Sequence, residues 1–147
     1  MKSNLLKAMI MSAITITGVI TTLTAEAASA SGTLGTSPAA ADSYTFFCPT
    51  GTTLTRISIT DSLTLRNNLT AVFATFGEFS VRTKTASDTE STPTTGSSAD
   101  NNVDHDGVYT LVVNKSAAGL EDYSVVADCI NSTGSRLPVT LTQKTNQ

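Results

Sequence analysis

The sequence predicts an all-β protein, a single antiparallel β-sandwich with one disulfide, preceded by a cleaved signal peptide. Three observations predict this class. Short segments that alternate apolar and polar residues recur along the chain and are separated by turn residues. Threonine, whose β-branched side chain suits a half-exposed strand, is the most common residue. After the apolar leader, no long run shows the spacing of an amphipathic helix.

The first thirty residues have the pattern of an export signal. Lys2 and Lys7 precede a mostly apolar run, 8–20. Two consecutive small-x-small sites follow, Ala25-Glu26-Ala27 and Ala28-Ser29-Ala30, so we expect cleavage after residue 27 or 30. The alternative is a membrane anchor, but the run is too short to cross a hydrocarbon core of roughly 30 Å. We therefore expect an exported chain, periplasmic or extracellular, with no stable membrane insertion after cleavage.

The mature chain has the size of one domain. We expect a flexible N-terminal arm at 31–41 and the sandwich at 42–144. Removing Lys2, Lys7 and Glu26 lowers the basic count from 9 to 7 and the acidic count from 12 to 11, which leaves a net charge of −4. The remaining basic residues are scattered and form no cationic stripe. These features disfavour nucleic acid as a partner.

We expect the strands to be separated by turns that contain Gly, Pro, Asn or Asp. The segment 107–113 and the segment 123–127 are predicted to form a hairpin around a turn at 116–119. The polar segment 86–106 is longer than most loops, which predicts a functional or mobile loop. The other expected strands are 43–48, 54–60, 69–76, 79–84 and 137–141.

Alternation also predicts which side chains form the core. The inward face of each strand should carry its large apolar residues, and burial of each such side chain stabilises the fold by about 1.5–3 kcal/mol. Phe76 and Phe79 flank Gly77-Glu78 and are expected either to close one end of the sandwich or to form a partly exposed apolar tip. The predicted core residues are Phe46, Ile57, Ile59, Phe73, Tyr109, Leu111, Val113, Tyr123, Val125, Ala127 and Cys129, with Leu137, Val139 and Leu141 from the last strand.

The two cysteines of the chain, Cys48 and Cys129, are predicted to form a disulfide. In an oxidising compartment such a pair is most simply bridged. The bridge is expected to tie two adjacent strand ends together. A reactive thiol is the alternative, but no CxxC spacing supports it.

Four stretches together resemble the bacterial pre-peptidase C-terminal domain. They are Asp42-Ser43-Tyr44-Thr45-Phe46, the Gly-x-x-Leu segment 51–57, the Gly-x-Tyr strand 107–113 and Asp122-Tyr123-Ser124-Val125. The resemblance covers roughly residues 34–129. It implies a jelly-roll-like sandwich and a non-catalytic role in secretion or substrate attachment. The chain departs from the family because no peptidase precedes the module here.

Few residues could carry chemistry. The one histidine, His105, lies between two aspartates, and no nucleophile-elbow motif is present, so we expect no enzyme activity. Asn102, Asp104 and Asp106 resemble the start of a calcium loop, but the twelfth position is Val113 where such a loop has Glu. The other interpretation is that these residues simply form turns. Calcium is the one cofactor that the sequence suggests.

The sequence therefore predicts an exported, non-catalytic binding or accessory module. No motif specifies its partner, which is expected to be a protein or a polysaccharide. One alternative is a structural subunit of an extracellular filament or matrix that assembles through sheet edges and the N-terminal arm. Another is a weak calcium-binding surface protein.

Overall fold

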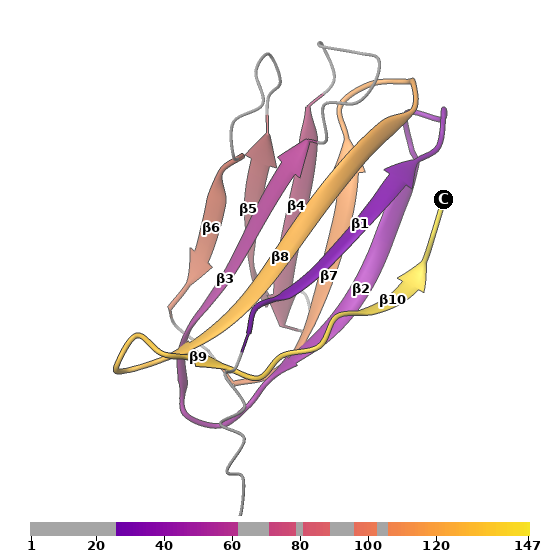
Figure 1. The fold of residues 1–147 in the computed structure, drawn as a ribbon. Helices are drawn as coiled ribbons and strands as arrows, with labels where there is room; N and C mark the ends of the chain where they lie inside the picture. The colour runs from indigo at the N-terminus through magenta and orange to yellow at the C-terminus, as the bar shows by residue number, and fades with distance from the viewer. Residues whose placement is uncertain (1–25, 62–70, 79–80, 89–95, 103–105) are drawn as a thin grey trace, which may run out of the picture.

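The computed structural model describes residues 26–61, 71–78, 81–88, 96–102 and 106–147, and within these ranges every regular element is a β-strand. The strands form two layers that face each other (Figure 1). In chain order they are β1 (Ala28–Leu34), β2 (Ala41–Cys48), β3 (Thr52–Asp61), β4 (Val72–Glu78), β5 (Val81–Asp88), β6 (Ser98–Asn101), β7 (Gly107–Lys115), β8 (Glu121–Asn131), β9 (Arg136–Leu137) and β10 (Thr142–Thr145).

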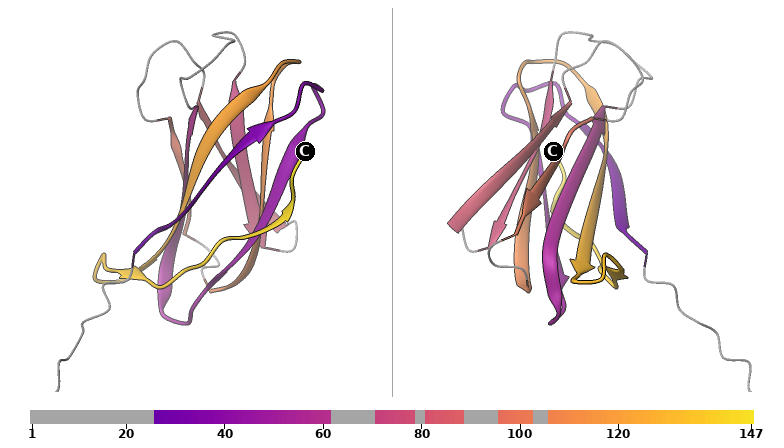
Figure 2. Two further views of the ribbon diagram at one scale, coloured as in Figure 1. Left: turned by 45° about the vertical axis from the view of Figure 1, so that its right-hand side comes forward. Right: turned by 90° about the vertical axis from the view of Figure 1, so that its left-hand side faces the viewer.

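The two layers are antiparallel sheets, which confirms the predicted all-β class. Sheet A has the order β1-β8-β3-β6, and β9 adds to β8. Sheet B has the order β10-β2-β7-β4-β5. Figure 2 shows the two layers from the side, with the core between them.

The first four strands pair with the next four in reverse order. β1 pairs with β8, β2 with β7, β3 with β6 and β4 with β5. Among β1–β8, consecutive strands therefore lie in opposite sheets, except for β4 and β5. The predicted hairpin between 107–113 and 123–127 is wrong, because β7 belongs to sheet B and β8 to sheet A. The five residues 116–120 between them can span the roughly 10 Å that separates packed sheets.

The core lies between the sheets and contains nearly all of the predicted residues. Tyr109, Leu111, Tyr123 and Val125 are fully buried, as are the two isoleucines of β3. Phe46 stacks on Tyr109 with ring centroids 5.0 Å apart. These contacts confirm the predicted inward faces of β2, β3, β7 and β8.

The predicted face of β4 is wrong. Val72, Ala74 and Phe76 point into the core, while Phe73 is only partly buried and faces outward. Odd-numbered and even-numbered positions of this segment are both apolar, apart from Thr75. Alternation alone therefore could not decide which face is buried. The first two residues of the predicted strand 69–76 lie outside the described residues. Phe76 helps to fill the core and is not an exposed tip.

The expected flexible arm at 31–41 is instead ordered structure. β1 pairs with β8 along its whole length, and Leu34 is fully buried. The connection to β2 is held as well, since Gly119 N–H donates to the Thr36 carbonyl at 3.0 Å and Lys115 donates to the Gly35 carbonyl. Small residues in β1 gave no apolar alternation, which is why the sequence pattern missed the strand.

The C-terminal segment is a strap that crosses from one sheet to the other. It begins in β9 on sheet A and ends in β10, which pairs with β2 at the edge of sheet B (Figure 1). The predicted strand 137–141 is mostly the irregular crossing between them. Leu137, Val139 and Leu141 nevertheless pack against the core, as expected. The expected long loop 86–106 is interrupted by β6 and by the end of β5.

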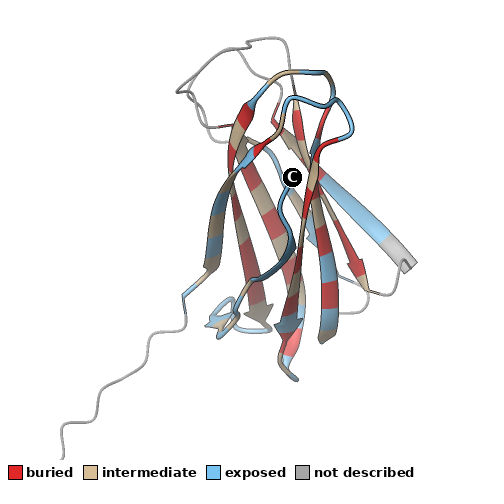
Figure 3. Cartoon of the chain, turned by 90° about the vertical axis from the view of Figure 1, so that its right-hand side faces the viewer, coloured by how far each residue is buried: buried red, intermediate tan, exposed pale blue. Residues whose placement is uncertain are grey.

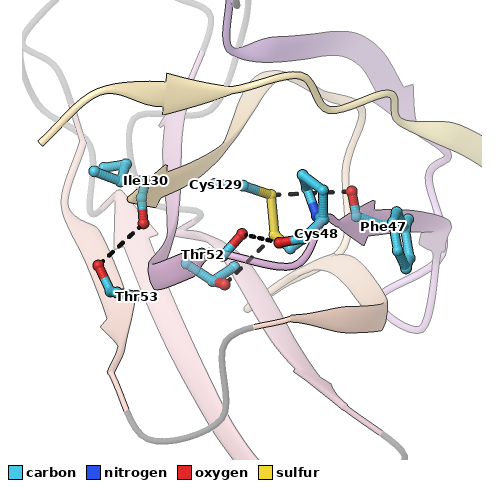
Figure 4. Close-up of a disulfide and its surroundings, with 8 residues drawn as sticks. Phe47, Cys48, Thr52, Thr53, Cys129 and Ile130 are labelled. Atoms are coloured by element: carbon cyan, nitrogen blue, oxygen red, sulfur yellow. Dashed lines mark hydrogen bonds between the residues drawn. A yellow bond between two sulfur atoms is a disulfide. The ribbon is translucent and has the colours of Figure 1, made fainter. Parts of the chain in front are cut away.

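The disulfide between Cys48 and Cys129 is present, with its Cα atoms 5.5 Å apart. We expected it to join neighbouring strands. It instead links β2 of sheet B to β8 of sheet A. Figure 4 shows the bridge between the ends of these strands. It therefore holds the two layers together at one end of the core.

A buried polar network also links β2 and β8. Its central residues, Asp42 and Tyr123, each lie six positions before the cysteine of their strand. The Tyr123 hydroxyl donates to Asp42 Oδ2 at 2.5 Å, and the Tyr44 hydroxyl lies 2.6 Å from that of Tyr123. The other oxygen of Asp42 accepts the Gln147 backbone N–H at 2.8 Å. Burial and the hydrogen bond to Asp42 raise the pKa of Tyr123, and burial raises the pKa of Tyr44. The tyrosines therefore stay protonated and serve as donors.

Candidate functional site

The outward side of sheet B is the candidate site, and we call it the outer face of sheet B. On β2, β4 and β7 its residues follow from the alternation of each strand, because the intervening side chains are buried; on β5 and β10 they are the cross-strand partners of those residues. Cross-strand pairing brings these outward positions into rows. The members are Ser43, Thr45, Phe47, Phe73, Thr75, Thr85, Ser87, Val108, Thr110, Val112, Asn114, Thr142 and Thr145.

Phe47 and Val108 form an apolar pair at one end of this face. They are direct cross-strand partners, and their exposed fractions are 54% and 49%. β10 pairs with β2 only along 43–45, so it does not extend alongside Phe47. Figure 4 shows the Phe47 ring directed away from the disulfide. An aromatic ring is thus accessible on a sheet surface.

The backbone on either side of Phe47 is firmly held. Phe46 is buried and stacks on Tyr109, and Cys48 is bonded to Cys129. Adjacent side chains of a strand point to opposite faces, so anchoring of these two neighbours fixes the direction of the Phe47 ring. The ring is therefore presented by a rigid element, which lowers the entropy cost of binding through it.

Hydroxyl groups occupy the middle of the face. Ser43 Oγ lies 2.8 Å from Thr145 Oγ1, and Thr75 Oγ1 lies 2.8 Å from Thr85 Oγ1. Thr45 has Thr110 as its cross-strand partner on one side and Thr142 on the other. These rows follow the spacing of neighbouring strands, about 4.8 Å. Each hydroxyl can donate one hydrogen bond and accept others.

None of the residues that make up the outer face of sheet B is charged. The opposite surface, on sheet A, is different. Arg56 there makes two hydrogen bonds to Asp100, at 2.7 and 2.8 Å, and Arg136 pairs with Asp128 at 2.6 Å. The hydrogen bond from Arg56 lowers the pKa of Asp100. These four charged residues of sheet A are thus paired with one another. On sheet B the described outward residues of β2 and β7 are uncharged, and the exposed lysines, Lys84 and Lys144, lie in the edge strands β5 and β10.

The predicted calcium residues are only partly described. Asn102 and Asp106 are exposed, at the end of β6 and at the start of β7, while Asp104 lies outside the described residues. Within the described ranges, no group of three or more His, Cys, Asp and Glu residues is arranged to hold a metal ion. The calcium site stays a prediction. His105 also lies outside the described part of the chain.

Sequence reasoning missed the outward aromatic residues. It considered Phe76 and Phe79, of which Phe76 is buried and Phe79 is not among the described residues. Tyr109 and Tyr123 are core residues, as expected, and Tyr44 is a core residue as well. A usable signal was present in the doublet Phe46-Phe47, because one of two adjacent strand residues must face outward.

Comparisons with protein-family models, curated proteins and solved structures found no match for this chain. The resemblance to the pre-peptidase C-terminal domain therefore stays a prediction. In the described parts of the chain, no helix is long and apolar enough to span a membrane.

Proposed function

We propose that the protein is an exported, non-catalytic binding module that binds its partner through the outer face of sheet B. The observation that carries this proposal is the contrast between the two outer surfaces. The surface of sheet A carries two ion pairs, whereas sheet B offers an exposed ring, Phe47, beside hydroxyl rows. Exposed aromatic residues amid polar groups are typical of binding surfaces.

The proposal also takes the fold to be a jelly roll, as the family resemblance implies. Support comes from the reversed pairing of β1–β4 with β5–β8, which is the arrangement expected when one long hairpin rolls into two sheets. Export is supported by the leader pattern and by the disulfide, which suits an oxidising compartment.

The test compares binding by two variants to the insoluble cell-envelope fraction and the secreted polymers of the source cells. Phe47→Ala removes the exposed ring, and Leu120→Ala is the matched control, since Leu120 is exposed by 40% but lies in the connection between β7 and β8. We expect Phe47→Ala to weaken co-sedimentation and Leu120→Ala to leave it unchanged. Equal binding by both variants and the wild type would remove the outer face of sheet B as the site.

A filament subunit remains the second candidate, with less support. The segment expected to donate a strand to a neighbour includes β1, which pairs with β8 of its own chain. Donation would require this pairing to open. Size-exclusion chromatography of the mature protein over a wide concentration range tests this candidate, and a constant monomer would exclude it.

A further inference from the structure

We propose that the ligand of the outer face of sheet B is a neutral polysaccharide, bound as a single chain and not as a crystalline surface. This inference rests on the proposed function, because it names the ligand class of the same face. Four properties of the face carry it: the lack of charge on β2 and β7, its hydroxyl rows, its exposed ring and its twist.

The lack of charge limits the ligand. A polyanion or polycation gains affinity from opposite charges on the protein, and the described outward residues of β2 and β7, around Phe47, carry none, since the exposed lysines of this sheet lie in its edge strands. A neutral polymer loses no ion solvation when it settles on such a face. Charge complementarity therefore favours a neutral ligand over nucleic acid, acidic glycan or a charged peptide.

The hydroxyl rows argue against an apolar partner surface, including a second copy of this chain. Covering Thr45, Thr110 and Thr142 with apolar groups would leave hydrogen-bond donors and acceptors without partners, which disfavours such a complex. Sugar hydroxyls both donate and accept, so a polysaccharide can satisfy these groups as it displaces water.

Phe47 supplies the apolar part of the interaction. The C–H groups on one face of a sugar ring can pack on an accessible aromatic ring while the sugar hydroxyls reach the neighbouring threonines. Val108 widens this platform, and Thr45 and Thr110 follow it on the same two strands. An apolar platform next to hydroxyls matches the two kinds of surface on one sugar unit.

The twist of the sheet favours a single polysaccharide chain over a crystalline polysaccharide surface as the ligand. Neighbouring strands rotate by about 20–25°, which amounts to roughly 60–75° over the three steps from β2 to β5. In Figure 3 the exposed part of β5 runs diagonally outward from the rest of its sheet. A flat surface would contact only one or two strands, whereas a flexible chain can follow the curvature.

The test measures the affinity of the mature, disulfide-bonded protein for defined polysaccharides by affinity electrophoresis and titration calorimetry. The neutral soluble probes are mixed-linkage β-glucan, xyloglucan, galactomannan and dextran. Polygalacturonate is the charged probe, and microcrystalline cellulose and chitin are the crystalline probes. We expect at least one neutral soluble probe to bind, and Phe47→Ala to lower that affinity about tenfold. Leu120→Ala should change it less than about twofold.

Several outcomes would overturn this inference. They are no binding to any neutral probe, binding to polygalacturonate alone, binding to the crystalline probes alone, or a dimer that dissociates on Phe47→Ala substitution. If the envelope fraction binds in a Phe47-dependent manner while the neutral probes do not, the binding face stands and the ligand class is wrong. If Phe47→Ala affects neither assay, the proposed function fails as well.

Discussion

Removing the disulfide should cost the protein a large part of its stability. The perturbation is the double variant Cys48→Ala/Cys129→Ala. The bridge joins residues 81 positions apart, and on the chain-entropy model closing such a loop stabilises the folded state by about 4.5 kcal/mol. Both sulfur atoms also lie in fully buried positions, and their loss adds about 1–2 kcal/mol.

The assay is guanidinium denaturation of wild type and variant, followed by tyrosine fluorescence and far-ultraviolet circular dichroism. A typical domain has a free energy of unfolding of about 5–15 kcal/mol, so the variant is expected to be barely stable. If it is unfolded in buffer, sucrose should restore the folded state and make the midpoint measurable. A loss below about 2 kcal/mol would refute the reasoning, because the bridge would then restrict the unfolded chain far less than its loop length implies.

Three further predictions follow from the buried network and from β1. The pKa of Tyr123 is raised in the folded state, so above pH 10 the unfolded state loses this proton while the folded state keeps it. The free energy of unfolding should therefore fall by up to about 1.4 kcal/mol per pH unit. A flat pH profile of stability would contradict this. Gly32→Ala should destabilise the folded state by about 1–3 kcal/mol, since the added Cβ would lie 2.6 Å from the Tyr123 hydroxyl. Gly35→Ala should destabilise it less, because the nearest atom to its Cβ would be 3.4 Å away. Thermal denaturation compares the two variants. The mature protein should begin at Ala28, because cleavage three residues later would remove the start of β1, and N-terminal sequencing that found Ser31 instead would exclude this.

The sequence was sufficient to predict the strands that alternate clearly and the partner of each cysteine. Ile57 and Ile59 alternate with polar residues, and their strand and its buried face are as expected. Phe73 shows where this kind of prediction fails. Its segment is apolar at both odd-numbered and even-numbered positions, so the buried face depends on pairing with β7 and β5. Alternation reports which side of a strand is buried but not which strand lies beside it.

The order of strands and the binding face could not be derived in the same way. Pairing of β1 with β8 joins segments that are far apart in the sequence, and nothing local in the small residues of β1 encodes it. The neutral outer face of sheet B arises only when residues from five separate strands come together. Phe47 alone could have been found in advance, from the doublet that it forms with Phe46.

The long-range contacts of Asp42 have a consequence for the timing of folding. This carboxylate accepts a hydrogen bond from a backbone N–H that is 105 residues further along the chain. β1 likewise waits for β8 before it gains a partner. A chain emerging residue by residue from a ribosome or a translocation channel cannot complete this structure until residue 147 has emerged. Folding should thus be a late and slow event, as is typical of topologies rich in distant contacts.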